Sequence, residues 1–271
     1  MRQFSGPNGP LNGAEHSTGP QGTDPPRYTR EAVRIYGLNA VTEALRAGRA
    51  RRLRVADRDD VRMRGVLDLA AARGVPVERT MREALDRDAQ HGVHQGVVAE
   101  VDPLPAGSLE AFTARLDPPP LIVVLDEVED PQNVGAILRT MDAVGATGLV
   151  RQTRRAAPLD GAAAKASAGA VHHVPVADTV NIARAVEQLK AAGVWTIGLD
   201  ASAEIPYHDW DLTLPTAIVL GAEGHGLRRL VRERCDSVVS IPMRGHVDSL
   251  NVSAAAAVVL YDALRQRSRG R

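Results

Sequence analysis

The chain has 271 residues, 44% of them hydrophobic, which is enough for one large or two modest cores. Lys and Arg number 33, as do Asp and Glu, so no overall charge draws the chain to a nucleic acid or a membrane surface. No apolar run approaches the ~20 residues of a membrane span.

A single cysteine, Cys235, leaves no internal disulfide and favours a reducing compartment. Residues 1–30 are rich in Gly, Pro, Ser and Asn, which predicts a disordered tail. This tail also lacks the apolar segment of a signal peptide. We therefore expect a cytoplasmic protein.

Ordered structure is expected to begin at residues 35–39. Alternation and helical periodicity then predict a small α/β domain over residues 31–102. Its expected helices span residues 40–47, 61–73 and 81–89, and its strands residues 52–56, 75–77 and 96–101.

A proline-rich linker is expected at residues 103–120, with a short helix inside it. A second domain, 121–271, opens on the continuous apolar run 121–126, which is typical of a parallel strand covered on both faces. Helices and strands then alternate, which predicts an α/β layer structure. The expected helices span residues 134–144, 182–192, 227–234 and 252–267, and the strands residues 148–151, 194–199, 217–220 and 237–241.

Basic residues are concentrated in the segment RAGRARRLR, residues 46–54. The segment is either an ordinary solvated face or a surface that contacts RNA phosphates, which position RNA without reading its sequence. The residues that the second interpretation selects are Arg49, Arg51, Arg52 and Arg54.

The first polar loop of the second domain leads into a helix with an apolar stripe, predicted to begin near Asn133. Asn133 can be explained as the cap of that helix. Arg139 lies off the stripe, where it is either a solvated surface residue or a functional one.

The second loop, Gly221–Gly226, reads GAEGHG, in which the glycines permit a tight turn. It is neither the dinucleotide fingerprint nor a phosphate-binding P-loop, which argues against a nicotinamide-dependent enzyme. Glu223 in this loop would also suit the positive end of the following helix.

The third loop precedes the last helix and ends in the polar run Ser249–Ser253. A capping role for Ser249 would not account for Asn251 and Ser253 as well. All three loops follow predicted strands, at the carboxyl ends where open α/β sheets bind ligands.

The three loops together resemble the SpoU (TrmH-like) family of RNA ribose 2′-O-methyltransferases. The matching motifs are N-x-G-x-x-x-R from Asn133, G-A-E-G-x-G from Gly221 and I-P-M-x-G-x-x-x-S-L-N-V-S from Ile241, and the resemblance covers about residues 120–268. Residues 35–37 and 93–99 resemble the ribosomal-protein-like substrate-binding domain that accompanies bacterial 23S rRNA guanosine 2′-O-methyltransferases of this family.

The resemblance implies a trefoil-knotted parallel-sheet domain, which no sequence rule would propose. It implies S-adenosylmethionine as cofactor, a homodimer joined through this domain, and no metal. It assigns cofactor contacts to Leu199, Gly221, Ile241 and Leu250.

The resemblance also assigns the central catalytic role to Arg139. Because arginine is effectively always protonated, Arg139 either positions the ribose and its phosphate or removes the 2′-hydroxyl proton in an adjusted environment. The polar groups expected around it are Asn133, Glu223, Ser249 and Asn251. The alternatives are a tRNA methyltransferase, an antibiotic-resistance rRNA methyltransferase, and a non-catalytic RNA-binding assembly factor.

Overall fold

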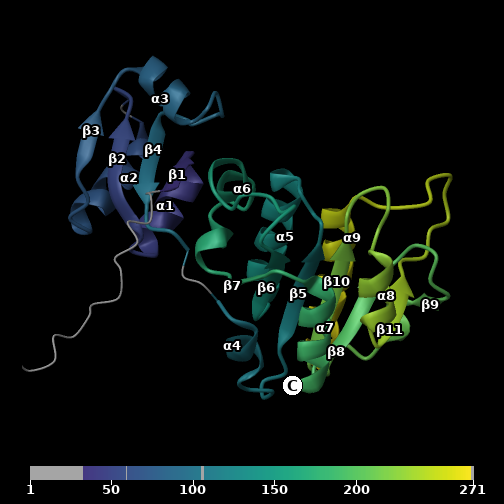
Figure 1. Ribbon diagram of the computed structural model, residues 1–271. Coiled ribbons are helices and arrows are strands. Elements are labelled where there is room, and N and C mark those ends of the chain that lie inside the picture. The colour runs from purple at the N-terminus through teal and green to yellow at the C-terminus, as the bar shows by residue number, and fades with distance from the viewer. Residues whose placement is uncertain (1–32, 59, 105–106, 270–271) are drawn as a thin grey trace, which may run out of the picture. The chain divides into compact units, whose positions relative to one another are not determined.

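The computed structural model of the chain describes residues 33–58, 60–104 and 107–269, which form two β-sheets with their helices (Figure 1). The predicted disordered tail, residues 1–30, lies outside the described residues. No helix in the described ranges is both long and apolar enough to span a membrane.

The first sheet has four strands in the order β1-β4-β2-β3. Strand β4 is antiparallel to both β1 and β2, whereas β3 is parallel to β2. The elements are β1 (Val33–Tyr36), α1 (Leu38–Arg46), β2 (Ala50–Val55), α2 (Val61–Ala72), β3 (Val77–Arg79), α3 (Arg82–Asp88) and β4 (Val97–Val101).

Helix α2 shows how local sequence sets these elements. The Asp60 carboxylate accepts hydrogen bonds from the backbone N–H groups of Arg62 and Met63, at 3.0 and 3.1 Å, and so caps the helix. Met63, Val66 and Ala70 form its buried stripe at helical spacing.

The second sheet has seven strands, all parallel, in the order β7-β6-β5-β10-β8-β11-β9. Its strands are β5 (Leu121–Asp126), β6 (Gly148–Gln152), β7 (Val176–Thr179), β8 (Trp195–Leu199), β9 (Ile205–Pro206), β10 (Thr216–Gly221) and β11 (Ser237–Ser240). Its helices are α5 (Pro131–Val144), α6 (Gly161–Ala166), α7 (Ile182–Ala191), α8 (Arg229–Arg234) and α9 (Val252–Arg269), and α4 (Leu109–Thr113) precedes the sheet.

Strand β5 is apolar throughout because the sheet is covered on both faces. Leu121, Val123 and Leu125 belong to the core that contains residues of α5 and α9. Ile122 and Val124 belong to the core that contains residues of α4, α7 and α8. Successive side chains of a strand point to opposite faces, so every position of β5 is buried.

The structure confirms the predicted α/β class with a parallel sheet, and the predicted elements are present with boundaries shifted by a few residues. Sequence periodicity missed β1, α6, β7 and β9, which have two to six residues each. Segments this short carry too little periodicity to be recognised. The trefoil knot stays a prediction.

All strands of the first sheet lie in the range predicted for one domain, and all strands of the second in the range predicted for the other. Contacts nevertheless join the described residues of the two sheets and their helices into one unit. One link is His173, whose Nε2 lies 2.9 Å from the Glu43 carboxylate of α1. The division into separate domains with a linker at 103–120 therefore stays a prediction.

Candidate active site

Three polar side chains from the three motif loops meet at the carboxyl ends of the parallel strands. Asn133 Nδ2 donates to Glu223 Oε1 at 2.9 Å. Asn251 Nδ2 donates to the same Glu223 oxygen at 2.7 Å and to Asn133 Oδ1 at 2.9 Å. We call Asn133, Glu223 and Asn251 the amide–carboxylate cluster. Its hydrogen bonds connect residues 28 to 118 positions apart in the chain.

Asn133 enters the cluster from the first turn of α5 and is 5% exposed. The sequence suggested that Asn133 caps this helix, but the structure shows otherwise. Asp130 does so instead, because its carboxylate accepts a hydrogen bond from the Gln132 backbone N–H at 2.9 Å. Pro131 occupies the first helical position, where no backbone donor is needed. The Asn133 amide is therefore free to bind Glu223 and Asn251.

Glu223 is presented by a tight turn between β10 and α8. Gly226 N donates to Ala222 O at 2.9 Å, and a Cβ added to Gly221 would lie 2.1 Å from the Gly226 carbonyl carbon. Gly224 and Gly226 have φ values of 89° and 64°, which disfavour other residues. The glycines of this motif thus fold the loop back on itself.

The same loop is held by a buried carboxylate on the neighbouring strand. Asp126 ends β5, is 0% exposed, and accepts hydrogen bonds from Arg228 N at 2.9 Å and Arg228 Nε at 2.7 Å. The Arg228 guanidinium also donates to Gln152 Oε1 at 3.0 Å. One arginine therefore ties the end of the glycine turn to both β5 and β6.

Asn251 has two functions in the structure. Its Oδ1 accepts a hydrogen bond from Ser253 N at 2.9 Å, which caps α9, while its Nδ2 supplies the two donor bonds to the cluster. Ser253 Oγ also donates to Asn251 Oδ1, at 2.6 Å. The interpretation of Ser249 as a cap is wrong, because its hydroxyl donates to Asp248 instead.

The motif glycine of α5 has a packing role. A Cβ added to Gly135 would lie 2.5 Å from Ala166 Cβ and 2.7 Å from the Ala163 carbonyl oxygen of α6. Only glycine allows the two helices to approach this closely. Gly135 therefore fixes the α5–α6 contact beside the cluster.

Arg139 is exposed on α5 and, within the described ranges, makes no hydrogen bond or ion pair. The structure therefore joins Asn133, Glu223 and Asn251, but it links neither Arg139 nor Ser249 to them. An exposed arginine with no protein partner is available to a ligand phosphate. The roles of Arg139 and Ser249 stay predictions.

The four residues predicted to contact the cofactor lie at or after the ends of adjacent strands. Leu199 ends β8, Gly221 ends β10 and Ile241 follows β11, and these strands are neighbours in the sheet. Leu199 and Ile241 are half-buried, and Leu250 is 40% exposed although it is a large apolar residue. Apolar side chains beside strand-end backbone groups suit an adenosine moiety. Their contact with a cofactor stays a prediction.

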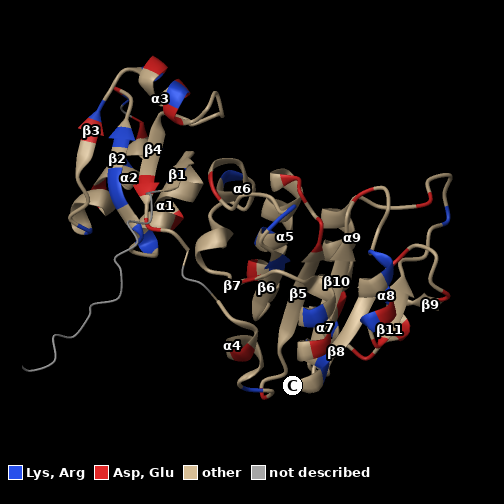
Figure 2. Ribbon diagram, viewed as in Figure 1, with Lys and Arg blue, Asp and Glu red and all other residues tan. Residues whose placement is uncertain are grey.

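The four arginines predicted to contact RNA lie on or beside β2, and acidic residues flank them. Figure 2 shows basic residues along β2 and acidic residues on the adjacent β3 and β4. Arg51 pairs with Asp102, Arg52 with Glu78, and Arg54 with Asp88. Arg49 contacts the Asp102 carbonyl oxygen and His172 Nδ1. The structure thus offers a largely neutralised surface here, and RNA contact by these residues stays a prediction.

Sequence reasoning missed Asp126 and Arg228. The sequence offered one signal for Asp126: it is a carboxylate at the end of an apolar strand, a position that often carries functional side chains in parallel sheets. No group of three or more His, Cys, Asp or Glu residues that could hold a metal occurs in the part of the chain that the structure describes.

Comparison with known proteins agrees with this geometry. The model of the SpoU rRNA Methylase family matches residues 120–261, and the model for RNA 2′-O ribose methyltransferase substrate binding matches residues 34–106. The family match begins just before β5 and includes all three loops of the cluster.

Individual relatives are similar over most of their length. The 23S rRNA (guanosine-2′-O-)-methyltransferase RlmB of Pseudomonas syringae pv. tomato is 42% identical over 244 residues, which cover 88% of this chain and 97% of that protein. An uncharacterized tRNA/rRNA methyltransferase of Mycolicibacterium smegmatis is 41% identical over 89% of this chain and 79% of its own.

Among solved structures, the SpoU methyltransferase AviRb from Streptomyces viridochromogenes, in complex with AdoMet, has a TM-score of 0.75 at 29% identity. The alignment covers 92% of this chain and 96% of that chain. With its motif loops, its parallel sheet and these matches, the chain belongs to the SpoU rRNA methylase family.

Proposed function

We propose that the protein transfers a methyl group from S-adenosylmethionine to the ribose 2′-hydroxyl of a guanosine in 23S rRNA, in the cytoplasm. The observation that carries the proposal is the amide–carboxylate cluster, in which all three family motifs converge on Glu223. The proposal of 23S rRNA and guanosine draws on the RlmB relatives, which are 41–44% identical to this chain.

The cluster leaves one carboxylate oxygen open. Glu223 Oε1 accepts hydrogen bonds from the amides of Asn133 and Asn251, whereas Oε2 has no partner in the described parts of the chain. We infer that Oε2 accepts a hydrogen bond from the ribose or from Arg139. The two amides hold the carboxylate in one orientation, so little reorganisation is required when substrate arrives.

The residues at the strand ends fit the cofactor. Leu199, Ile241 and Leu250 provide apolar surface, and the backbone of Gly221 adds donor and acceptor groups. When bound, S-adenosylmethionine supplies a methyl group on a sulfonium, which is a good leaving group because it becomes a neutral thioether. What this chain must add is orientation and activation of the 2′-hydroxyl, a weak nucleophile while it keeps its proton.

Arg139 is proposed to position the acceptor nucleotide. Its guanidinium presents donors in a fork that matches phosphate geometry, and it has no competing carboxylate in the described ranges. A phosphate held there would direct the adjoining ribose toward Glu223. Ser249, in the exposed loop before α9, is proposed to complete the polar surroundings of the ribose.

A homodimer is proposed on the basis of α9. Ala254, Val258 and Tyr261 are exposed on this helix at spacings of four and three residues, so they share one face. Such an apolar stripe is typical of a helix that packs against another subunit. Light scattering should give twice the mass of one chain at micromolar concentration. A monomeric, fully active enzyme would contradict the proposal.

Alkaline hydrolysis of modified RNA tests the acceptor atom. A free 2′-hydroxyl attacks its neighbouring phosphate in alkali, whereas a 2′-O-methyl group removes that nucleophile. RNA modified by the protein should therefore lack one rung of the alkaline ladder, and RNA treated with the Arg139→Ala variant should keep it. A complete ladder from RNA that has taken up labelled methyl groups would mean that a base is the acceptor.

A tRNA substrate is the second candidate, because the M. smegmatis relative is described as a tRNA/rRNA methyltransferase. Parallel assays with unmodified 23S rRNA transcript and unmodified tRNA decide between the two. Incorporation into tRNA alone would overturn the 23S rRNA proposal while leaving the ribose chemistry intact.

A further inference from the structure

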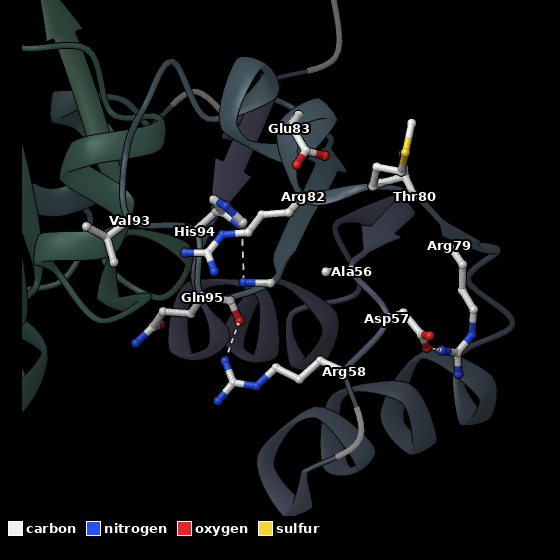
Figure 3. A pocket seen from close by; sticks show the side chains of 12 residues that line it. Ala56, Asp57, Arg58, Arg79, Thr80, Arg82, Glu83, Val93, His94 and Gln95 are labelled. Carbon is white, nitrogen blue, oxygen red and sulfur yellow. Dashed lines mark hydrogen bonds and ion pairs between the residues drawn. The ribbon is translucent and has the colours of Figure 1, made fainter.

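A cavity of about 1010 Å³ opens on the first sheet (Figure 3), and none of the residues that line it belongs to the amide–carboxylate cluster. Three segments line it: residues 56–58 after β2, residues 79–83 between β3 and α3, and residues 93–96 before β4. Because β2 and β3 are parallel and β4 is antiparallel to β2, these three segments meet at one edge of the sheet. That edge is where α/β units bind ligands.

The loop before β4 is held in a fixed conformation. His94 is 5% exposed; its Nδ1 accepts a hydrogen bond from Gly96 N at 3.0 Å, and its Nε2 lies 3.0 Å from the Asp86 carboxylate. Gln95 has a φ of 54°, in the left-handed region, and its Oε1 accepts a hydrogen bond from Leu38 N at 3.1 Å. This wall of the cavity therefore exists before any ligand binds.

Donor groups facing the cavity remain available to a ligand. Figure 3 shows Arg58, Arg82 and Gln95 with their polar ends toward the same space, but Arg58 already pairs with Asp60 and donates to the Gln95 carbonyl oxygen at 3.2 Å. Arg82 has no partner in the described ranges, and the Gln95 amide nitrogen has none there either. Arg79 pairs at 2.7 Å with Asp57, but that carboxylate is 94% exposed, so the pair is weak and exchangeable.

One large apolar side chain on the cavity wall, that of Val93, is exposed to solvent. Val93 is 66% exposed and belongs to none of the hydrophobic cores, and Figure 3 shows it on the same side of the cavity as Arg82 and Gln95. An apolar side chain beside the unpaired Arg82 guanidinium suits a nucleotide, whose base has an apolar face and whose phosphate is anionic. By contrast, the arginines of β2 already have carboxylate partners.

We propose that this cavity binds an unstacked nucleotide of the substrate RNA, with Val93 against the base and Arg82 on a phosphate. The inference rests on the proposed function, since it places a second RNA contact away from the nucleotide that is methylated. It also explains how an RNA-binding domain can act while its β2 arginines are neutralised.

The test uses the full chain with Arg82→Ala and Val93→Ala combined, and unmodified 23S rRNA transcript as the probe. We expect KM for the transcript to rise about tenfold, as the loss of a base contact predicts, while kcat and S-adenosylmethionine affinity stay within about twofold. The slope of log affinity against log salt should fall by roughly 0.7–0.9 for the lost phosphate contact.

Arg73→Ala is the matched control, because it removes an equally exposed and unpaired arginine at the end of α2, at the opposite edge of the sheet. It should leave KM and the salt slope unchanged. A double variant with the KM of the Arg73→Ala control would overturn the cavity proposal. A wild-type protein that neither binds nor methylates the transcript would instead refute the proposed function.

Discussion

The Asn251 side-chain amide donates to Glu223 Oε1 at 2.7 Å while its carbonyl oxygen caps helix α9. One residue therefore both starts the last helix and closes the polar cluster. The two functions use different atoms, so they can be separated by substitution.

Asn251→Ser should separate them. Serine can still cap α9 and alanine cannot, so Asn251→Ser should be about 1 kcal/mol more stable to unfolding than Asn251→Ala, while both variants lose the two donor bonds to the cluster. Both variants lack the donor to Glu223 and should lose most methyl transfer. Chemical denaturation and single-turnover assays measure the two effects. An active Asn251→Ser variant would show that the cluster does not orient the reacting groups.

Arg139→Ala should abolish detectable methyl transfer. If the guanidinium stabilises the transition state, the rate constant should fall about 100-fold or more. Affinity for S-adenosylmethionine should stay within a few-fold. Because Arg139 is exposed and unpaired among the described residues, its loss should change stability by no more than about 0.5 kcal/mol. Single-turnover rates, calorimetric titration and thermal melting provide the three readouts. Near wild-type turnover would remove Arg139 from the mechanism.

Arg228→Gln should destabilise the protein by about 2 kcal/mol, because it leaves the Asp126 carboxylate buried without a cation. The value lies below that for a fully buried pair, since the Arg228 side chain is 42% exposed. The turn that carries Glu223 should also loosen, so kcat should fall. Arg229→Gln is the control, since Arg229 makes only an exposed pair with Glu233. Equal unfolding midpoints for the two variants would contradict the prediction.

Leu250→Trp should weaken S-adenosylmethionine binding by about tenfold, or about 1.4 kcal/mol. Leu250 is 40% exposed near the strand ends that are proposed to hold the cofactor, and a larger ring would occupy that space. Val180→Trp enlarges a residue that is 88% exposed beyond β7, the outermost strand, and serves as the control. Calorimetry that finds equal affinity in both variants would exclude Leu250 from the cofactor site.

His172 should make stability depend on pH. Burial, followed by the Arg49 guanidinium and His173, lowers the pKa of His172 from 6.5 to about 4, against an opposing effect of Glu43. The folded state therefore favours the neutral ring. The contribution of His172 to the free energy of unfolding, up to about 3 kcal/mol, is fully present above pH 6.5 and is lost as the pH falls toward 4.

Urea denaturation at pH 7.5 and pH 4.5 checks this expectation. Wild type should lose about 2–3 kcal/mol more than His172→Gln between the two values. The comparison removes the contribution of carboxylates, which both proteins share. Equal losses would show that His172 titrates normally in the folded protein.

The sequence by itself determined the class of fold and the motif loops. The apolar run of β5 and the apolar stripe of α5 are local patterns. The spacing of apolar residues that defines each of them repeats within a single strand or within a few helical turns. The motif residues likewise revealed the family resemblance, because the residues of each motif lie close together in one short segment of the chain.

Only the tertiary structure decided which residues meet. Glu223 joins Asn133 and Asn251 because their loops converge at the carboxyl edge of the sheet, where β10 pairs directly with β5, a relation between segments 95 residues apart in register. The same is true of the β2 arginines, which read as a free basic patch until Glu78, Asp88 and Asp102 are placed beside them. Local sequence sets the period of an element, but strand order and charge balance arise from pairings between distant segments, and no local pattern encodes those.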